Sequence, residues 1–191
     1  AAISESMAGA AVRREEEAGR CTAYEATGGT LSVAAGRISY LLGLTGPCLT
    51  ADTACSAMLV AVHLCRRALD DDECVGATAC GAGLLLDPSV CAAFGVAGML
   101  SPVGRCYTFD ERADGFNRAE GAAASTIECS DVAGATPRTQ VLGSAAQQDG
   151  SSASLTAPNG TSQRRLLRSV QEGSEAGAEE LRWLEAHGTG T

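Results

Sequence analysis

The sequence predicts a layered α/β fold, in which short apolar strands alternate with amphipathic helices. Two observations carry this prediction. Residues 31–42 place apolar side chains at helical spacing, and residues 74–83 form a short run of small and apolar residues typical of a buried strand. With 191 residues, 45% of them hydrophobic, the chain can bury the core of one domain or of a large part of one.

The first third of the chain is expected to contain three helices and a strand. Residues 1–30 have little pattern and should be irregular, apart from one short helix around Arg13. A helix follows from Leu31 to Leu42 and ends at Gly43. After the Gly46-Pro47 break we expect a short strand, a tight turn and a helix over residues 56–69.

The middle of the chain continues the alternation. Cys74 to Gly83 is expected to be a strand buried on both faces, because its residues are small and apolar. Asp87 can cap a helix that begins with proline and spans about Pro88 to Val96. A loop rich in paired charges follows over residues 101–121, and Glu120 to Glu128 is the next predicted strand.

The last third of the chain is expected to contain two strands and a helix. The strands are Thr139 to Ala145 and Leu181 to Ala186, and between them Ser162 starts a helix after a loop over residues 147–160. The apolar side chains expected to face inward from this helix are Leu166, Leu167 and Val170. The basic side chains expected to face solvent are Arg164, Arg165 and Arg168.

Composition excludes several classes of function. A net charge of −9, from 14 Lys+Arg and 23 Asp+Glu, argues against nucleic acid or an anionic membrane as the main partner. No apolar run is long enough to cross a bilayer, and the first 20 residues lack the pattern of a signal peptide. Nine cysteines without a C-x-x-C pair indicate reduced thiols and a cytoplasmic protein. Zinc is not expected, because His63 and His187 are far apart in the sequence and no ligand quartet has the spacing of a zinc site.

Cys55 is the candidate nucleophile. It follows Asp52 and Thr53, either of which could cap the next helix, and so lies in or beside the first helical turn. Free backbone N–H groups and the helix dipole favour a thiolate there. The alternative for any one of nine cysteines is a buried structural role.

Two histidines compete as its partner. His63 lies eight residues further along the same helix, about 12 Å away at 1.5 Å per residue, so we interpret it as structural. His187 follows an apolar run and precedes Gly188 and Gly190, which would let a ligand approach the backbone closely. His187 is therefore the better catalytic candidate, with a buried structural histidine as the alternative.

Four segments together resemble one family. They are GPCLTADTACSAMLVAVHLC, AGMLSPVGRCYTFDERADGFNRAEG, LTAPNG and LEAHGTGT, and they resemble β-ketoacyl synthase domains, most closely the ketosynthases of modular or type I polyketide synthases. The resemblance runs in order from about Tyr24 to Thr191. It implies the thiolase fold, two similar α/β halves in αβαβα layers, and a homodimer. Residues 1–191 would then be a partial ketosynthase domain, covering most of the first half and the start of the second.

The resemblance implies a role for each matching residue. Cys55 matches the nucleophile that accepts the acyl chain from a phosphopantetheine thioester, and His187 matches the first of two catalytic histidines. Thr189 and Thr191 match hydroxyls that bind the pantetheine arm. The strand before Cys55 matches the one that pairs across the dimer axis.

The implied activity is that of an acyltransferase. The acyl chain moves to Cys55, and a decarboxylative Claisen condensation follows with a malonyl-type extender on acyl carrier protein. The domain binds no metal or cofactor of its own, since the substrate is carried on the phosphopantetheine of the carrier. The family's second histidine and its lysine match positions beyond Thr191, so these 191 residues alone are expected to be inactive.

Some positions depart from the family pattern, and two other functions stay open. Ala119 stands where the family usually has glycine, Gln147 where it usually has asparagine, and the connection over residues 130–138 is short. Asp110 and Glu120 match charged-loop positions that support the site without doing chemistry.

The main alternative is a silent ketosynthase-like module that binds carrier protein or pairs with an active partner. A weaker one is a cysteine hydrolase, for which no residue orienting His187 is evident.

Overall fold

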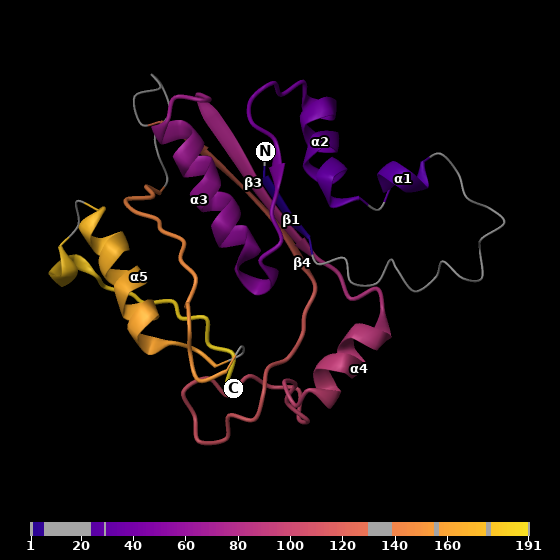
Figure 1. Cartoon of the computed structure of the whole chain (residues 1–191), viewed down its shortest axis with the longest axis vertical. Coiled ribbons are helices and arrows are strands. Elements are labelled where there is room, and N and C mark those ends of the chain that lie inside the picture. The colour runs from indigo at the N-terminus through magenta and orange to yellow at the C-terminus, as the bar shows by residue number, and fades with distance from the viewer. Residues whose placement is uncertain are drawn as a thin grey trace.

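The computed structural model describes residues 2–5, 24–28, 30–129, 139–154, 157–174 and 177–190. In this part of the chain a four-stranded sheet has the order β2-β1-β3-β4. The strands are β1 (Ala2–Glu5), β2 (Leu49–Thr50), β3 (Gly76–Gly83) and β4 (Gly121–Glu128). β1 is parallel to both β2 and β3, while β4 is antiparallel to β3 along its whole length (Figure 1).

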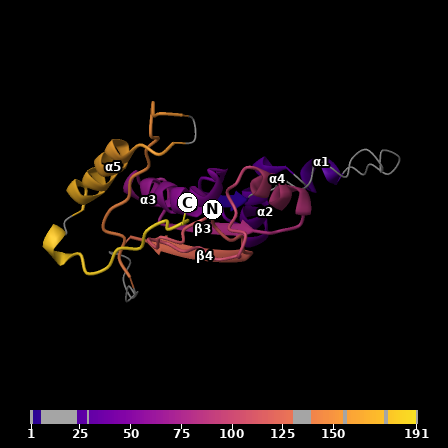
Figure 2. The same cartoon turned by 90° about the horizontal axis from the view of Figure 1, so that it is seen from below.

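Helices cover one face of this sheet (Figure 2). The helical segments are α1 (Glu25–Gly28), α2 (Leu31–Leu42), η2 (Ala54–Ser56), α3 (Ala57–Asp70), α4 (Pro88–Val96), α5 (Gly160–Glu172) and η3 (Ala178–Glu180). In both views α5 lies beyond α3, on the opposite side from α2 and α4 (Figure 1, Figure 2). Among the described helices, none has the length and apolar character needed to span a membrane.

The predicted ends of α2 and α4 are confirmed, because local side chains and backbone define them. Gly43 adopts φ +65° after α2, and its N–H points back to the carbonyls of Ser39 and Tyr40. Asp87 Oδ1 accepts a hydrogen bond from Ser89 N at 2.8 Å, which caps α4 ahead of its first-turn proline. Both helices were therefore predictable from sequence alone.

The core lies between α3 and the sheet. Ala61 and Ala79 are fully buried there and Cys65 nearly so. The side chain of Met58 lies over Gly81, where an added Cβ would come within 3.1 Å of the sulfur. Small residues on both elements thus let α3 pack closely on β3.

Strand β3 is less buried than predicted. α3 covers the face that carries Ala77 and Ala79. The alternate side chains Thr78 and Cys80 are only half-buried and Ala82 is exposed, because side chains of a strand alternate between its two faces. The expectation of burial on both faces was wrong for the described residues.

One observed strand was not predicted, and two predicted strands are not strands in the structure. Strand β1 was missed, whereas residues 139–145 and 181–186 were predicted as strands and have no strand partner among the described residues. Residues 139–145 instead run beside α5. A Cβ added to Gly143 would lie only 2.9 Å from the carbonyl oxygen of Val170 in that helix. The predicted helix around Arg13 and the connection over residues 130–138 lie outside the described residues.

Helix α5 starts earlier than predicted. Asn159, not Ser162, marks its start, since Asn159 Oδ1 accepts hydrogen bonds from the N–H groups of Thr161 and Ser162. Leu167 was expected to face inward but is 63% exposed. The three arginines are exposed as predicted: Arg164, Arg165 and Arg168.

Candidate active site

Cys55 lies in the turn that joins β2 to α3. Asp52 Oδ1 accepts a hydrogen bond from Ala54 N at 2.9 Å, and Ser56 Oγ donates to the Thr53 carbonyl at 3.0 Å. Neither Asp52 nor Thr53 caps α3 as predicted, because η2 intervenes and Ser56 occupies the cap position without a side-chain cap bond. The two predicted cap residues instead organise the turn that presents Cys55.

The backbone immediately before Cys55 is strained. Ala54 has φ +53°, a left-handed conformation that costs an L-residue about 1–2 kcal/mol. Such strain persists only where neighbouring contacts hold it, and it is concentrated at functional sites. The Cys55 thiol that follows is free and exposed, as a nucleophile that must meet a substrate requires.

This turn lies at the carboxyl edge of the parallel strands. β2 ends at Thr50 just before the turn, and β3 ends at Gly83 before α4, so both strands point to the same edge. Figure 1 shows the C-terminal end of the chain beyond this same end of α3. Ligands of open α/β sheets bind at such an edge.

The His187 segment is held by the charged loop between α4 and β4. Thr108 Oγ1 donates a hydrogen bond to the Gly188 carbonyl at 2.5 Å, and Gly115 N donates to the Gly190 carbonyl at 3.0 Å. Gly188 and Gly190 have φ +59° and +69°, so both need the conformational freedom of glycine. The His187 side chain itself is exposed.

The two glycines serve a different purpose from the one predicted. They were expected to admit a ligand, but the close approach comes from the chain itself. A Cβ on Gly188 would lie 2.9 Å from Thr108 Cγ2, and one on Gly190 would lie 3.1 Å from Tyr107 N. No pattern in the sequence indicated Thr108 or Gly115, although two glycines beside a candidate histidine were an indirect signal of close packing.

The charged loop is braced by its own side chains. Asp110 accepts from Arg112 Nε and from a terminal guanidinium nitrogen, both at 2.8 Å, and the guanidinium stacks 4.4 Å from the Tyr107 ring centre. These hydrogen bonds from Arg112 lower the pKa of the Asp110 carboxyl below its ordinary value of 3.8. Glu120 Oε1 accepts from Leu85 N at 2.8 Å, which ties the start of β4 to the end of β3.

The Cys55 turn follows the end of β2, and the His187 segment is held by the loop that leads into β4. Among the described residues no hydrogen bond links the two side chains. Thr189 is half-buried between the two glycines, whereas Thr191 lies outside the described residues. His63 has the structural environment predicted for it, since its Nδ1 lies 2.9 Å from Ser144 Oγ and its side chain is half-buried.

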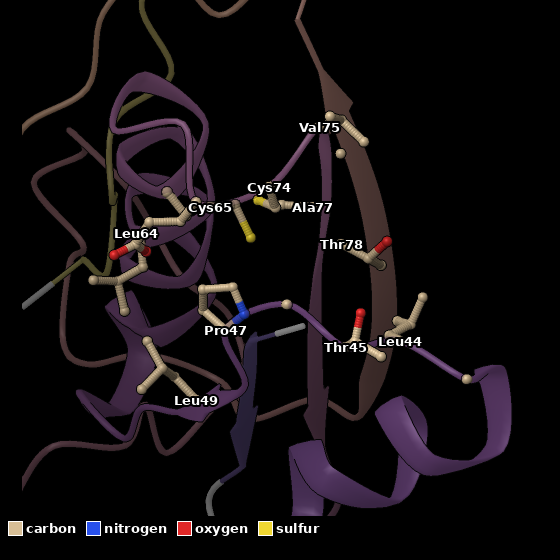
Figure 3. A pocket seen from close by; sticks show the side chains of 15 residues that line it. Leu44, Thr45, Pro47, Leu49, Leu64, Cys65, Cys74, Val75, Ala77 and Thr78 are labelled. Carbon is tan, nitrogen blue, oxygen red and sulfur yellow. The ribbon is translucent and has the colours of Figure 1, made fainter.

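A pocket of about 530 Å³ opens at the opposite end of the sheet. Its walls are the segment that follows α2, the last turns of α3 and the first residues of β3, and its lining is mainly apolar (Figure 3). Cys55, His187 and Thr189, the predicted site residues that the structure describes, do not line it. The described residues also contain no cluster of three or more side chains suited to a metal ion.

The comparisons with known proteins show the family. Residues 1–133 match the family model of the β-ketoacyl synthase N-terminal domain, and residues 138–191 match that of the C-terminal domain. The chain therefore belongs to the β-ketoacyl synthase family, as its motifs predicted.

The relatives are polyketide synthases. The chain is 46% identical over 172 residues to a phenolphthiocerol/phthiocerol polyketide synthase of Mycobacterium tuberculosis, covering 88% of this chain and 8% of that protein. It is 47% identical over 168 residues to a polyketide synthase of Streptomyces halstedii, covering 86% of this chain and 2% of that protein. The chain thus spans less than a tenth of the length of these relatives.

Solved structures agree in fold. An oxazolomycin ketosynthase domain of Streptomyces albus superimposes with a TM-score of 0.89 at 31% identity, covering 100% of this chain and 34% of that one. The ketosynthase from module 6 of the bacillaene synthase of Bacillus subtilis superimposes with a TM-score of 0.82 at 36% identity, covering 100% of this chain and 33% of that one. The predicted thiolase-like α/β fold is confirmed.

Proposed function

We propose that residues 1–191 are part of a polyketide synthase ketosynthase that condenses acyl chains, with Cys55 as its nucleophile. The observation that carries the proposal is the exposed Cys55 thiol on a strained turn that directly follows the carboxyl end of β2. Family membership and the polyketide synthase relatives support the same reaction class.

The first step is acyl transfer. The Cys55 thiolate attacks the carbonyl carbon of an acyl thioester, a C–S bond to Cys55 forms, and the C–S bond to the carrier's pantetheine breaks. The departing pantetheine thiolate takes up the proton that Cys55 lost. A thiolate suits this role because it is both a good nucleophile and a good leaving group.

The second step forms the carbon–carbon bond. A malonyl-type thioester loses CO₂, and the resulting enolate attacks the acyl carbonyl, which releases Cys55 as a thiolate. In our proposal an N–H of neutral His187 stabilises the developing enolate oxygen, the kind of electrostatic support that lowers such barriers most.

The proposed partners follow from the same chemistry. Acyl carrier protein would deliver both substrates on phosphopantetheine, whose arm would hydrogen-bond to Thr189 and Thr191. A second copy of the protein would pair along β2, which lies at the edge of the described sheet and leaves Leu49 exposed.

Mass spectrometry of the full-length protein tests the nucleophile. After incubation with an acyl-pantetheine thioester, we expect one acyl adduct on the Cys55 peptide, absent from Cys55→Ala. Cys129→Ala is the matched control, because Cys129 is also free and exposed but lies at the far end of β4. A folded wild-type protein without an adduct would overturn the proposal and favour the silent module.

A further inference from the structure

We propose that Thr108 is the positioning residue for His187, acting through the Gly188 peptide rather than by touching substrate. The inference rests on the proposed function of His187 and adds a residue that matches no catalytic position in the motifs. Its two parts have separate tasks. The hydroxyl fixes the carbonyl of the residue that follows His187, and the methyl group fills the space beside that glycine.

The contacts of Thr108 are specific to this segment. Its Oγ1 donates to the Gly188 carbonyl at 2.5 Å, and its Cγ2 lies 2.9 Å from the place that a Cβ on Gly188 would occupy. Thr108 is half-buried, so the hydrogen bond is partly shielded from competing water. One side chain therefore limits both the rotation and the sideways movement of the peptide next to His187.

The His187 ring has little else to hold it. Its side chain is exposed and, within the described residues, has no hydrogen-bond partner. The segment before it, residues 181–186, is exposed and pairs with no strand in the described part of the chain. The position of the imidazole consequently depends on the backbone that follows it, which Thr108 and Gly115 anchor.

The loop that carries Thr108 is rigid enough to serve as an anchor. Asp110 N donates to the Tyr107 carbonyl and Ala113 N donates to the Asp110 carbonyl, both at 3.1 Å. The bidentate Arg112–Asp110 pair closes the same turn. Thr108 thus links a braced loop to the segment that carries His187.

Thr108→Val and Thr108→Ser separate the two contributions in the full-length protein. Valine keeps the shape and removes the donor, whereas serine keeps the donor and removes the methyl group. We expect Thr108→Val to slow condensation about tenfold, the loss that corresponds to one hydrogen bond. Acylation of Cys55 should change less than about twofold, and Thr108→Ser should retain most of the condensation rate. The matched control is Thr126→Val, which removes the Thr78–Thr126 hydroxyl contact on β3 and β4 and should leave both rates unchanged.

A double-mutant cycle with His187→Ala decides whether Thr108 acts through the histidine. If it does, Thr108→Val should cause no further loss of condensation rate in a protein that already carries His187→Ala. Equal losses in both backgrounds, or an equal loss of acylation and condensation, would overturn the inference, as would a Thr108→Ser variant as slow as Thr108→Val. The proposed function fails by a different result, namely a condensation rate that His187→Ala leaves unchanged in the otherwise wild-type protein, whereas a strongly reduced residual rate is what the cycle measures.

Discussion

Gly115 is the residue of the charged loop whose substitution should do the most damage. Gly115 is buried at φ +135°, and a Cβ built there would lie 2.5 Å from Leu100 C and from Ser101 N. Both atoms belong to the backbone and cannot turn aside as a side chain could. Gly115→Ala must therefore move the loop, which also donates the hydrogen bond to the Gly190 carbonyl.

Gly104→Ala is the matched control for this prediction. Gly104 also has a positive φ, +68°, but its Cβ would meet only Asn117 Oδ1, at 4.0 Å. Alanine in the left-handed conformation of Gly104 costs about 1–2 kcal/mol. Gly115, at φ +135°, lies outside that allowed region, so the conformational cost of alanine is larger there as well. The backbone overlap adds about 1–3 kcal/mol at Gly115 alone, the range found for overpacked sites.

The assay compares denaturant midpoints and condensation rates of the two variants in the full-length protein. We expect Gly115→Ala to be the less stable variant by at least about 1 kcal/mol and to lose condensation, while Gly104→Ala keeps its rate. Equal midpoints and equal rates for the two variants would show that the overlap at Gly115 is relieved without cost, and the reasoning would be wrong.

Two further predictions concern the α5 cap and the charged loop. Asn159→Ala should lower the free energy of unfolding by about 1–2 kcal/mol in denaturation experiments, because it removes the Oδ1 acceptor for the N–H groups of Thr161 and Ser162. Asn159→Asp keeps that acceptor but loses the Nδ2 donor to the carbonyls of Asp149 and Ser151, so it should also be less stable than the wild type; an Asn159→Ala variant as stable as the wild type would contradict the capping role. In an NMR titration the Asp110 carboxyl should have a pKa below 3.8, so its pair with Arg112 supports the fold above that pH and is lost as pH falls through the lowered pKa. Arg112→Gln should return the Asp110 pKa towards its ordinary value, and an unchanged pKa would refute the assigned cause.

Elements defined by local chemistry could be predicted from the sequence. Helix α2 carries its own periodicity and its glycine stop, and α4 carries its own Asp87 cap. Strands β3 and β4 are long enough for their composition to indicate them. Cys55 was found in the same way, because the turn before α3 is encoded in consecutive residues.

Elements defined by distant partners could not be predicted. Strand β1 is four residues of weak pattern, and its strand geometry comes from pairing with both β2 and β3. Residues 139–145 and 181–186 show the opposite error, since strand-like composition forms no strand without a neighbour. Thr108 and Gly115 were missed for the same reason. Their importance comes from contacts with residues about 75 positions away or more, which no local pattern records.

The two halves of the candidate site therefore differ in how they are held. The Cys55 turn is closed by hydrogen bonds between neighbours in sequence, so it should survive changes elsewhere in the chain. The His187 segment depends on hydrogen bonds from the loop at residues 107–115. Damage to that loop should leave the thiol ready for acylation and impair only the step that needs the histidine. A variant in the loop that lost both steps together would show that the two halves are not independent.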